Sequence, residues 1–159
     1  MTKIIDNFLD VDYFNKIKEL VFGDNFSWYY NAQVNNDQSK DSLNFYMTHL
    51  VFAEKPNSEH FDFFKPLFDK IGVKQLIRVK INLYPRSETL SVNAPHVDFD
   101  YKHKGFILYL NTCDGYTVLK DRKVESIENR ALFFDSSVPH SSTTCTNATA
   151  RFNMNINYI

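Results

Sequence analysis

The sequence has only two cysteines, almost no net charge and no long apolar segment, and each shortage excludes a class of protein. Cys113 and Cys145 lack the short spacing of a zinc or redox motif, so we expect reduced thiols in a cytoplasmic protein. A net charge of −1 gives no electrostatic case for binding nucleic acid or an acidic membrane surface. No apolar run approaches the ~20 residues that a membrane-spanning helix requires.

The first residues and the length of the chain indicate its location and its number of domains. Residues 1–14 carry acidic side chains where a signal peptide would have an apolar core, which again favours a cytoplasmic location. The 159 residues fit one domain, and 15 Phe and 9 Tyr predict a core built on aromatic packing. We expect helical and lid elements over about residues 1–74 and a β core over about residues 75–159.

Hydrophobic periodicity predicts a helix near the start of the chain and mostly strands towards its end. Asp10 can cap a helix whose apolar face is Phe14, Ile17 and Val21, and Gly23 can end it. A second, Phe-rich stretch near residues 58–72 also has helical spacing. Strands are expected at residues 45–52, 75–84, 105–111, 131–134 and 150–158, with a short hairpin about residues 121–122. This order is typical of an antiparallel sandwich or barrel with helices packed on one outer face.

Two of the predicted strands alternate between apolar and polar residues. In residues 150–158 the apolar face would pack on the N-terminal helices, and the face that begins with Arg151 would point into a cavity. The polar face of residues 75–84 consists of Arg78, Lys80, Asn82 and Tyr84. That face could line a cavity or be exposed to solvent, and the pattern alone favours the solvent-exposed arrangement.

A candidate metal-binding pair follows the second of these strands. His96 and Asp98 are expected in a strand or at its end, where residues two apart point to the same face, roughly 6–7 Å apart. An imidazole and a carboxylate can then close on one ion. His140 is a candidate third ligand, because the intervening strands can return it to the same end. Two histidines and one carboxylate, with open positions opposite, form the ligand set of non-haem Fe(II) oxygenases.

The other three histidines are weaker candidates. His60 and Asp62 repeat the spacing, but on a helix residues two apart diverge by about 200° and cannot chelate together. We therefore predict that both are surface residues. His49 is expected to be a packed or edge residue of its strand and not a ligand. His103 is expected to be exposed, because it lies in a turn between two lysines.

Several pieces of the chain, in this order, resemble the Fe(II)/2-oxoglutarate-dependent dioxygenases, especially their prolyl-4-hydroxylase-like branch. The resemblance runs from about residue 75 to the C-terminus, with a weaker echo in residues 4–20. The matching pieces are NLYP at residues 82–85, HVD at 96–98, YLN at 109–111, LFFD at 132–135 before His140, and Arg151. The chain departs from the branch at Gly115, where one glycine stands in place of the usual two.

The resemblance implies a mainly β fold with packed N-terminal helices, a double-stranded β-helix that is also called a cupin-like jelly-roll. It implies that His96, Asp98 and His140 hold Fe(II), which 2-oxoglutarate chelates through its keto and near carboxylate groups. The far carboxylate would pair with Arg151 and the hydroxyl of Tyr109. Tyr84 matches a further tyrosine near this cosubstrate. The asparagines expected to line the cavity are Asn82, Asn111, Asn153 and Asn155.

The family activity couples oxidative decarboxylation of 2-oxoglutarate by O2 to hydroxylation of a C–H bond. The resemblance also allows ascorbate as a further cofactor. A prolyl residue in a peptide is the substrate that the family favours. A free amino acid or another small molecule stays open, as does the oligomeric state. The polar loops at residues 31–44 and 86–95 would flank the mouth and select the substrate. The alternative is a catalytically silent jelly-roll that binds a metal or a small ligand, and the complete ligand set with its arginine favours the enzyme.

Overall fold

The main element of the structure, a computed structural model that describes residues 2–34 and 45–159, is an antiparallel sheet of eight strands. Seven of them follow the order β1 (Lys3–Ile5), β9 (Ala131–Asp135), β6 (Lys104–Tyr109), β10 (Ala150–Tyr158), β5 (Leu76–Pro85), β3 (Tyr46–Ala53) and β2 (Tyr29–Asn31). The eighth, β4 (Lys55–Pro56), pairs with β3. A separate ribbon consists of β7 (Tyr116–Val118) and β8 (Lys123–Glu125). The five strands predicted outside the His96 segment and the hairpin are therefore confirmed, and β10 begins and ends where expected.

The two predicted helical regions also form. Asp10 caps α1 (Val11–Phe22), where its Oδ1 accepts a hydrogen bond from the Tyr13 backbone N–H at 2.9 Å. The Phe-rich stretch forms a 3-10 turn, η1 (Phe61–Phe64), that continues into α2 (Lys65–Ile71). Gly72 closes α2 with a φ of 75°, a left-handed conformation that favours glycine. Within the described part of the chain, neither helix is long and apolar enough to cross a membrane.

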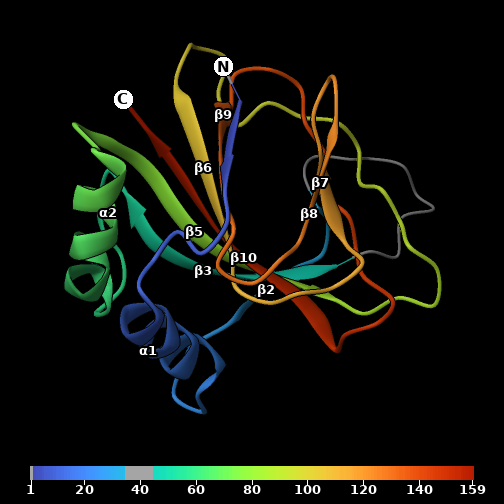
Figure 1. Cartoon of the computed structure of the whole chain (residues 1–159), viewed down its shortest axis with the longest axis horizontal. Helices are drawn as coiled ribbons and strands as arrows, with labels where there is room; N and C mark the ends of the chain where they lie inside the picture. Colours follow the sequence, from blue (N-terminus) through green and yellow to red (C-terminus); the bar gives the residue numbers. More distant parts are fainter. Residues whose placement is uncertain (1, 35–44) are drawn as a thin grey trace.

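The main hydrophobic core lies between these helices and one face of the large sheet. Figure 1 shows both helices on the same side of the sheet, away from the β7–β8 ribbon. The predicted apolar face of α1 is buried there, together with Met154 and Ile156 of β10, which are both fully buried. At the edge of this core the rings of Phe22 and Phe152 lie 4.8 Å apart. The expected packing of β10 on the N-terminal helices is confirmed.

A second wall faces the other side of the sheet. It consists of β7, β8 and the connecting segments 86–103 and 136–149, which isolated backbone bridges join to one another. These bridges pair Val92 with Thr143, His96 with His140 and Val118 with Ser141. The large sheet and the second wall enclose a cavity between them. This arrangement is the predicted double-stranded β-helix.

Candidate active site

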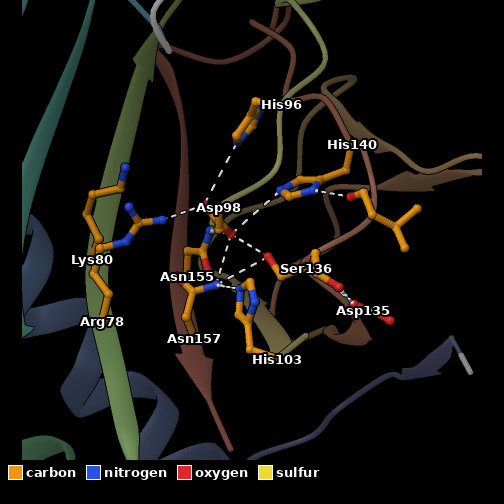
Figure 2. Close-up of polar contacts among 12 residues, drawn as sticks. Arg78, Lys80, His96, Asp98, His103, Asp135, Ser136, His140, Asn155 and Asn157 are labelled. Atoms are coloured by element: carbon orange, nitrogen blue, oxygen red, sulfur yellow. Dashed lines mark hydrogen bonds and ion pairs between the residues drawn. The ribbon is translucent and has the colours of Figure 1, made fainter. Parts of the chain in front are cut away.

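Three predicted residues converge at one end of the cavity. The ligand atoms of His96, Asp98 and His140 all lie within 4.8 Å of one another. Asp98 Oδ1 is 4.0 Å from His96 Nε2, and Asp98 Oδ2 is 3.7 Å from His140 Nε2 (Figure 2). The two imidazoles and the carboxylate are thus close enough to bind one ion.

A backbone bridge, and not a strand, holds the two histidines together. The N–H of His96 donates to the carbonyl of His140, and the reverse bond has the same length of 2.9 Å. The ring centroids lie 4.5 Å apart. The predicted strand at His96 is wrong, because residues 87–103 form an irregular segment of the second wall. His140 Nδ1 faces the Val138 carbonyl oxygen at 3.0 Å, which favours the proton on Nδ1 and leaves Nε2 free towards Asp98.

The Asp98 carboxylate is held by donors from three parts of the chain. Arg78 Nη2 contacts its Oδ1, and Ser136 Oγ donates to its Oδ2. Asn157 Nδ2 of β10 also donates to Oδ2, at 2.9 Å (Figure 2). Burial alone would raise the pKa of Asp98, but the Arg78 charge, these hydrogen bonds and the nearby His140 outweigh it and hold the pKa well below its usual range. The carboxylate is therefore ionised at neutral pH.

The donor set suits Fe(II). Burial and the neighbouring His140 lower the pKa of His96 to about 4, so this imidazole is neutral and its lone pair is available. A neutral imidazole and an ionised carboxylate are ligands that Fe(II) accepts. The residues present therefore fit the metal that the sequence predicts.

A buried arginine lies elsewhere in the same cavity. Arg151 is fully buried, and its Nη2 donates to Thr117 Oγ1 at 3.0 Å while its Nη1 donates to the Thr143 carbonyl at 3.3 Å. Its Nε has no hydrogen-bond partner. Within residues 2–34 and 45–159, no carboxylate forms an ion pair with it. Gly115 packs directly against it, since a Cβ there would lie 2.6 Å from Arg151 Cδ.

The two predicted tyrosines both lie close to this guanidinium. The Arg151 Cζ is 5.5 Å from the Tyr84 ring and 5.6 Å from the Tyr109 ring. Tyr84 lines the cavity and stacks on Tyr46, with the ring centroids 5.6 Å apart. Tyr109 lies behind the lining, and its hydroxyl is 2.8 Å from Thr117 Oγ1. Thr117 does line the cavity and contacts both Tyr109 and Arg151.

The cavity has a volume of about 560 Å³, and its sheet side is formed by the polar faces of β5 and β10. Cross-strand pairs join Tyr84 to Arg151, Asn82 to Asn153, and Lys80 to Asn155. The prediction that the polar face of β5 is exposed to solvent is therefore wrong, because the second wall covers this face. Three of the predicted asparagines line the cavity, namely Asn82, Asn153 and Asn155.

Asn111 is placed elsewhere, outside the residues that line this cavity. Its Nδ2 donates to the Ala150 carbonyl and its Oδ1 accepts from the Phe152 N–H, each at 2.9 Å. It joins β10 to the segment after β6. The prediction that Asn111 lines the cavity is thus wrong.

His103 is also misplaced by the sequence prediction, since it is buried and not exposed. Its Nδ1 lies 2.8 Å from the Tyr101 carbonyl oxygen, and its Nε2 is 3.3 Å from Asn157 Nδ2 (Figure 2). It therefore lies behind Asn157, which in turn contacts Asp98. The flanking lysines misled the prediction, because they are exposed while the imidazole points inward.

The remaining histidines do not join the site. His49 is packed as predicted, with its ring nitrogens 2.8 Å from the Ser27 carbonyl oxygen and 2.7 Å from Ser58 Oγ. His60 is half-buried and stacks on Phe26, so its predicted surface position is only partly right. Asp62 is exposed, as expected. Of the predicted polar loop 31–44, residues 35–44 lie outside the described residues.

Sequence reasoning missed four residues that support the site, namely Arg78, Thr117, Ser136 and Asn157. Arg78 and Asn157 could have been found, because they continue the polar faces of β5 and β10 and pair across the two strands. Thr117 and Ser136 carry no local signal, since each becomes important only through its contact with Arg151 or Asp98.

No protein-family model and no curated protein sequence matches the chain. Solved structures do match it over 99% of its length. One is a prolyl hydroxylase from Trichoplax adhaerens in complex with a hypoxia inducible factor oxygen degradation domain peptide fragment, with 16% identity, a TM-score of 0.69 and 83% of that chain covered. A prolyl-4-hydroxylase from Pseudomonas putida matches with 14% identity, a TM-score of 0.67 and 91% coverage. A 2OG-Fe(II) oxygenase family protein from Burkholderia pseudomallei matches with 13% identity, a TM-score of 0.72 and 84% coverage. The chain thus has the double-stranded β-helix fold of prolyl hydroxylases and other 2-oxoglutarate- and Fe(II)-dependent oxygenases.

Proposed function

We propose that this protein is a 2-oxoglutarate- and Fe(II)-dependent dioxygenase that hydroxylates a C–H bond. One observation carries the proposal: the cavity that holds His96, Asp98 and His140 also holds Arg151, a buried cation without a carboxylate partner among the described residues. Burying a charge without a counter-charge is costly, so a ligand that brings a carboxylate to Arg151 would relieve that cost.

The spacing within β10 supports a dicarboxylate as that ligand. Arg151 and Asn155 are four residues apart on one face of the strand, a separation of about 13 Å. Asn155 Nδ2 is 3.4 Å from Asp98 Oδ2. This span therefore leads from the arginine to the end of the cavity that holds His96, Asp98 and His140, which we call the metal-binding end. A five-carbon dicarboxylate can meet the long Arg151 side chain with one carboxylate and an ion at Asp98 with the other.

Each residue then has a defined task. His96, Asp98 and His140 would hold Fe(II), and Arg151 would hold the far carboxylate of 2-oxoglutarate with Thr117 fixing the guanidinium. Iron and 2-oxoglutarate together supply the chemistry, in which one atom of O2 enters succinate as CO2 leaves and the other enters the substrate as a hydroxyl. Tyr84, stacked on Tyr46, would close the cosubstrate end against water.

Two substrate classes are candidates for this cavity. The Trichoplax adhaerens prolyl hydroxylase that this chain resembles binds a peptide fragment, which supports a peptide as one candidate. A small molecule is the other candidate. Both would enter the same cavity and meet the same metal-binding end.

The first experiment measures metal binding and succinate production. The protein should bind one divalent ion per chain, and with Fe(II), O2 and 2-oxoglutarate it should release succinate. His140→Ala should abolish both, because it removes a ligand, whereas the matched control His60→Ala should keep both. If His60→Ala lost the metal while His96→Ala kept it, the assignment of the ligands would be wrong. Metal binding without any succinate would favour the silent jelly-roll.

A further inference from the structure

Lys80 lines the cavity and has no task in the proposed cosubstrate site. Its Nζ is 3.5 Å from the Tyr46 hydroxyl oxygen and 5.4 Å from the centre of the Tyr46 ring. Within the described ranges 2–34 and 45–159, no carboxylate forms an ion pair with it. Burial and the Arg78 charge lower the pKa of Lys80 to about 8, so the ammonium still carries its charge at pH 7.

The charges of the cavity show that Lys80 is the cation left over. The described lining has three cationic side chains, Arg78, Lys80 and Arg151, against the one carboxylate of Asp98. Arg78 is already paired with Asp98. A divalent ion would add two positive charges and 2-oxoglutarate two negative ones, so the pair leaves this excess unchanged. With Arg151 assigned to 2-oxoglutarate, Lys80 still lacks a counter-charge.

Lys80 lies near the metal-binding end of the cavity. It is two residues from Arg78 on β5 and directly across from Asn155 on β10. Both neighbours contact Asp98, and in Figure 2 Lys80 lies beside Arg78 at that end. A ligand group at Lys80 would therefore be close to the place where a substrate C–H bond must come to react.

From this geometry we propose that Lys80 binds a carboxylate of the substrate, so that the substrate is an acid and not a neutral prolyl residue. The inference rests on the proposed function, because it needs 2-oxoglutarate to occupy Arg151. The carboxylate could be that of a free amino acid or of an acidic side chain in a peptide. A charge-assisted hydrogen bond of this kind strengthens binding by about tenfold to a hundredfold.

The test compares acids with their neutral carboxamides. The protein is loaded with Mn(II) and 2-oxoglutarate, and NMR line broadening by the Mn(II) reports which probes bind near the metal. One set of probes is the free L-amino acids and their α-carboxamides. The other is N-acetyl-aspartate and N-acetyl-glutamate α-amides with their asparagine and glutamine counterparts. These two sets distinguish a free amino acid from an acidic side chain.

We expect at least one acid to bind about tenfold or more tightly than its carboxamide. Lys80→Met should remove this preference and Lys80→Arg should keep it, while the exposed Lys16→Met on α1 serves as the matched control. The inference is overturned if no acid binds better than its carboxamide, or if Lys80→Met keeps the preference.

Titration of 2-oxoglutarate separates this inference from the proposed function. Lys80→Met should bind 2-oxoglutarate within about twofold of the wild-type affinity, because Arg151 holds that ligand. A loss as large as that of an Arg151 variant would place Lys80 in the cosubstrate site, which would overturn the inference and leave the proposed function standing. If the wild-type protein bound no 2-oxoglutarate, the proposed function itself would fail.

Discussion

Replacing Arg151 with methionine should abolish tight 2-oxoglutarate binding and yet change the stability of the ligand-free protein little. In that state the guanidinium makes two hydrogen bonds, to Thr117 and Thr143, and no ion pair with a described carboxylate. Thr117 Oγ1 keeps its partner Tyr109 after the substitution, so only the Thr143 carbonyl loses a donor, at a cost of about 1–3 kcal/mol. Removing a buried, unpaired charge offsets that cost. We expect the free energy of unfolding to stay within about 2 kcal/mol of wild type.

The effect on binding should be far larger. Removing one partner of a buried charged pair costs about 2–5 kcal/mol, which is roughly a 30-fold to 5,000-fold rise in the dissociation constant for 2-oxoglutarate. Arg151→Lys should fall between wild type and methionine, because an ammonium keeps the charge but loses the planar, two-pronged donor. Metal affinity should survive in both variants, since Arg151 is not among the converging ligand residues.

The assay is calorimetric titration of 2-oxoglutarate into the metal-loaded protein without oxygen, with urea unfolding of the ligand-free protein alongside. Arg122→Met is the matched control, because Arg122 is an exposed arginine paired with Asp121 in the β7–β8 turn. If Arg151→Met titrated like wild type, 2-oxoglutarate would bind elsewhere or not at all. A variant that unfolded without ligand would show instead that Arg151 is a structural residue.

Three further predictions concern the strands around the cavity. Ile156→Ala should lower the free energy of unfolding by roughly 2–5 kcal/mol in urea, because Ile156 is fully buried in the main core, and a loss below about 1 kcal/mol would contradict this. Gly115→Ala should weaken 2-oxoglutarate binding without weakening metal binding, because the new methyl group would meet Arg151, and an unchanged titration would refute the contact. The lowered pKa of Lys80 means that the unfolded chain binds more protons than the folded one between about pH 8 and pH 10.5, so this group should make stability rise with pH over that window. The rise should be smaller in Lys80→Met, and identical pH profiles would contradict the assignment.

The alternation within single strands was predicted well, because it depends only on neighbouring residues. In β10 the period of two correctly divides Met154 and Ile156 from Arg151 and Asn155. The same period in β5 grouped Arg78 with Lys80 but could not say what covers them. The cover comes from segments 86–103 and 136–149, which join through isolated bridges and have no periodicity of their own.

The structure brings the three predicted metal-ligand candidates together, but through a different contact from the one predicted. Strand geometry was expected to align His96 with Asp98, whereas the structure aligns His96 with His140 through a backbone bridge. A bridge between residues 44 positions apart leaves no trace in the local pattern. The prediction for His103 was wrong for a related reason. The two lysines beside it indicate that the turn is exposed, but they do not determine where the His103 side chain points.

The register of β10 connects the two ends of the cavity and explains why its pattern is so regular. One face of the strand presents Arg151 to one end of the cavity and Asn157 to Asp98 at the other, while the opposite face enters the main core through Ile156. A slip by one residue would exchange these faces, since side chains alternate with a period of two. The guanidinium would then enter the apolar core, and Ile156 would enter the cavity beside Asp98. Each error is costly, so the same residues that stabilise the fold also fix the distance between the arginine and the metal-binding end.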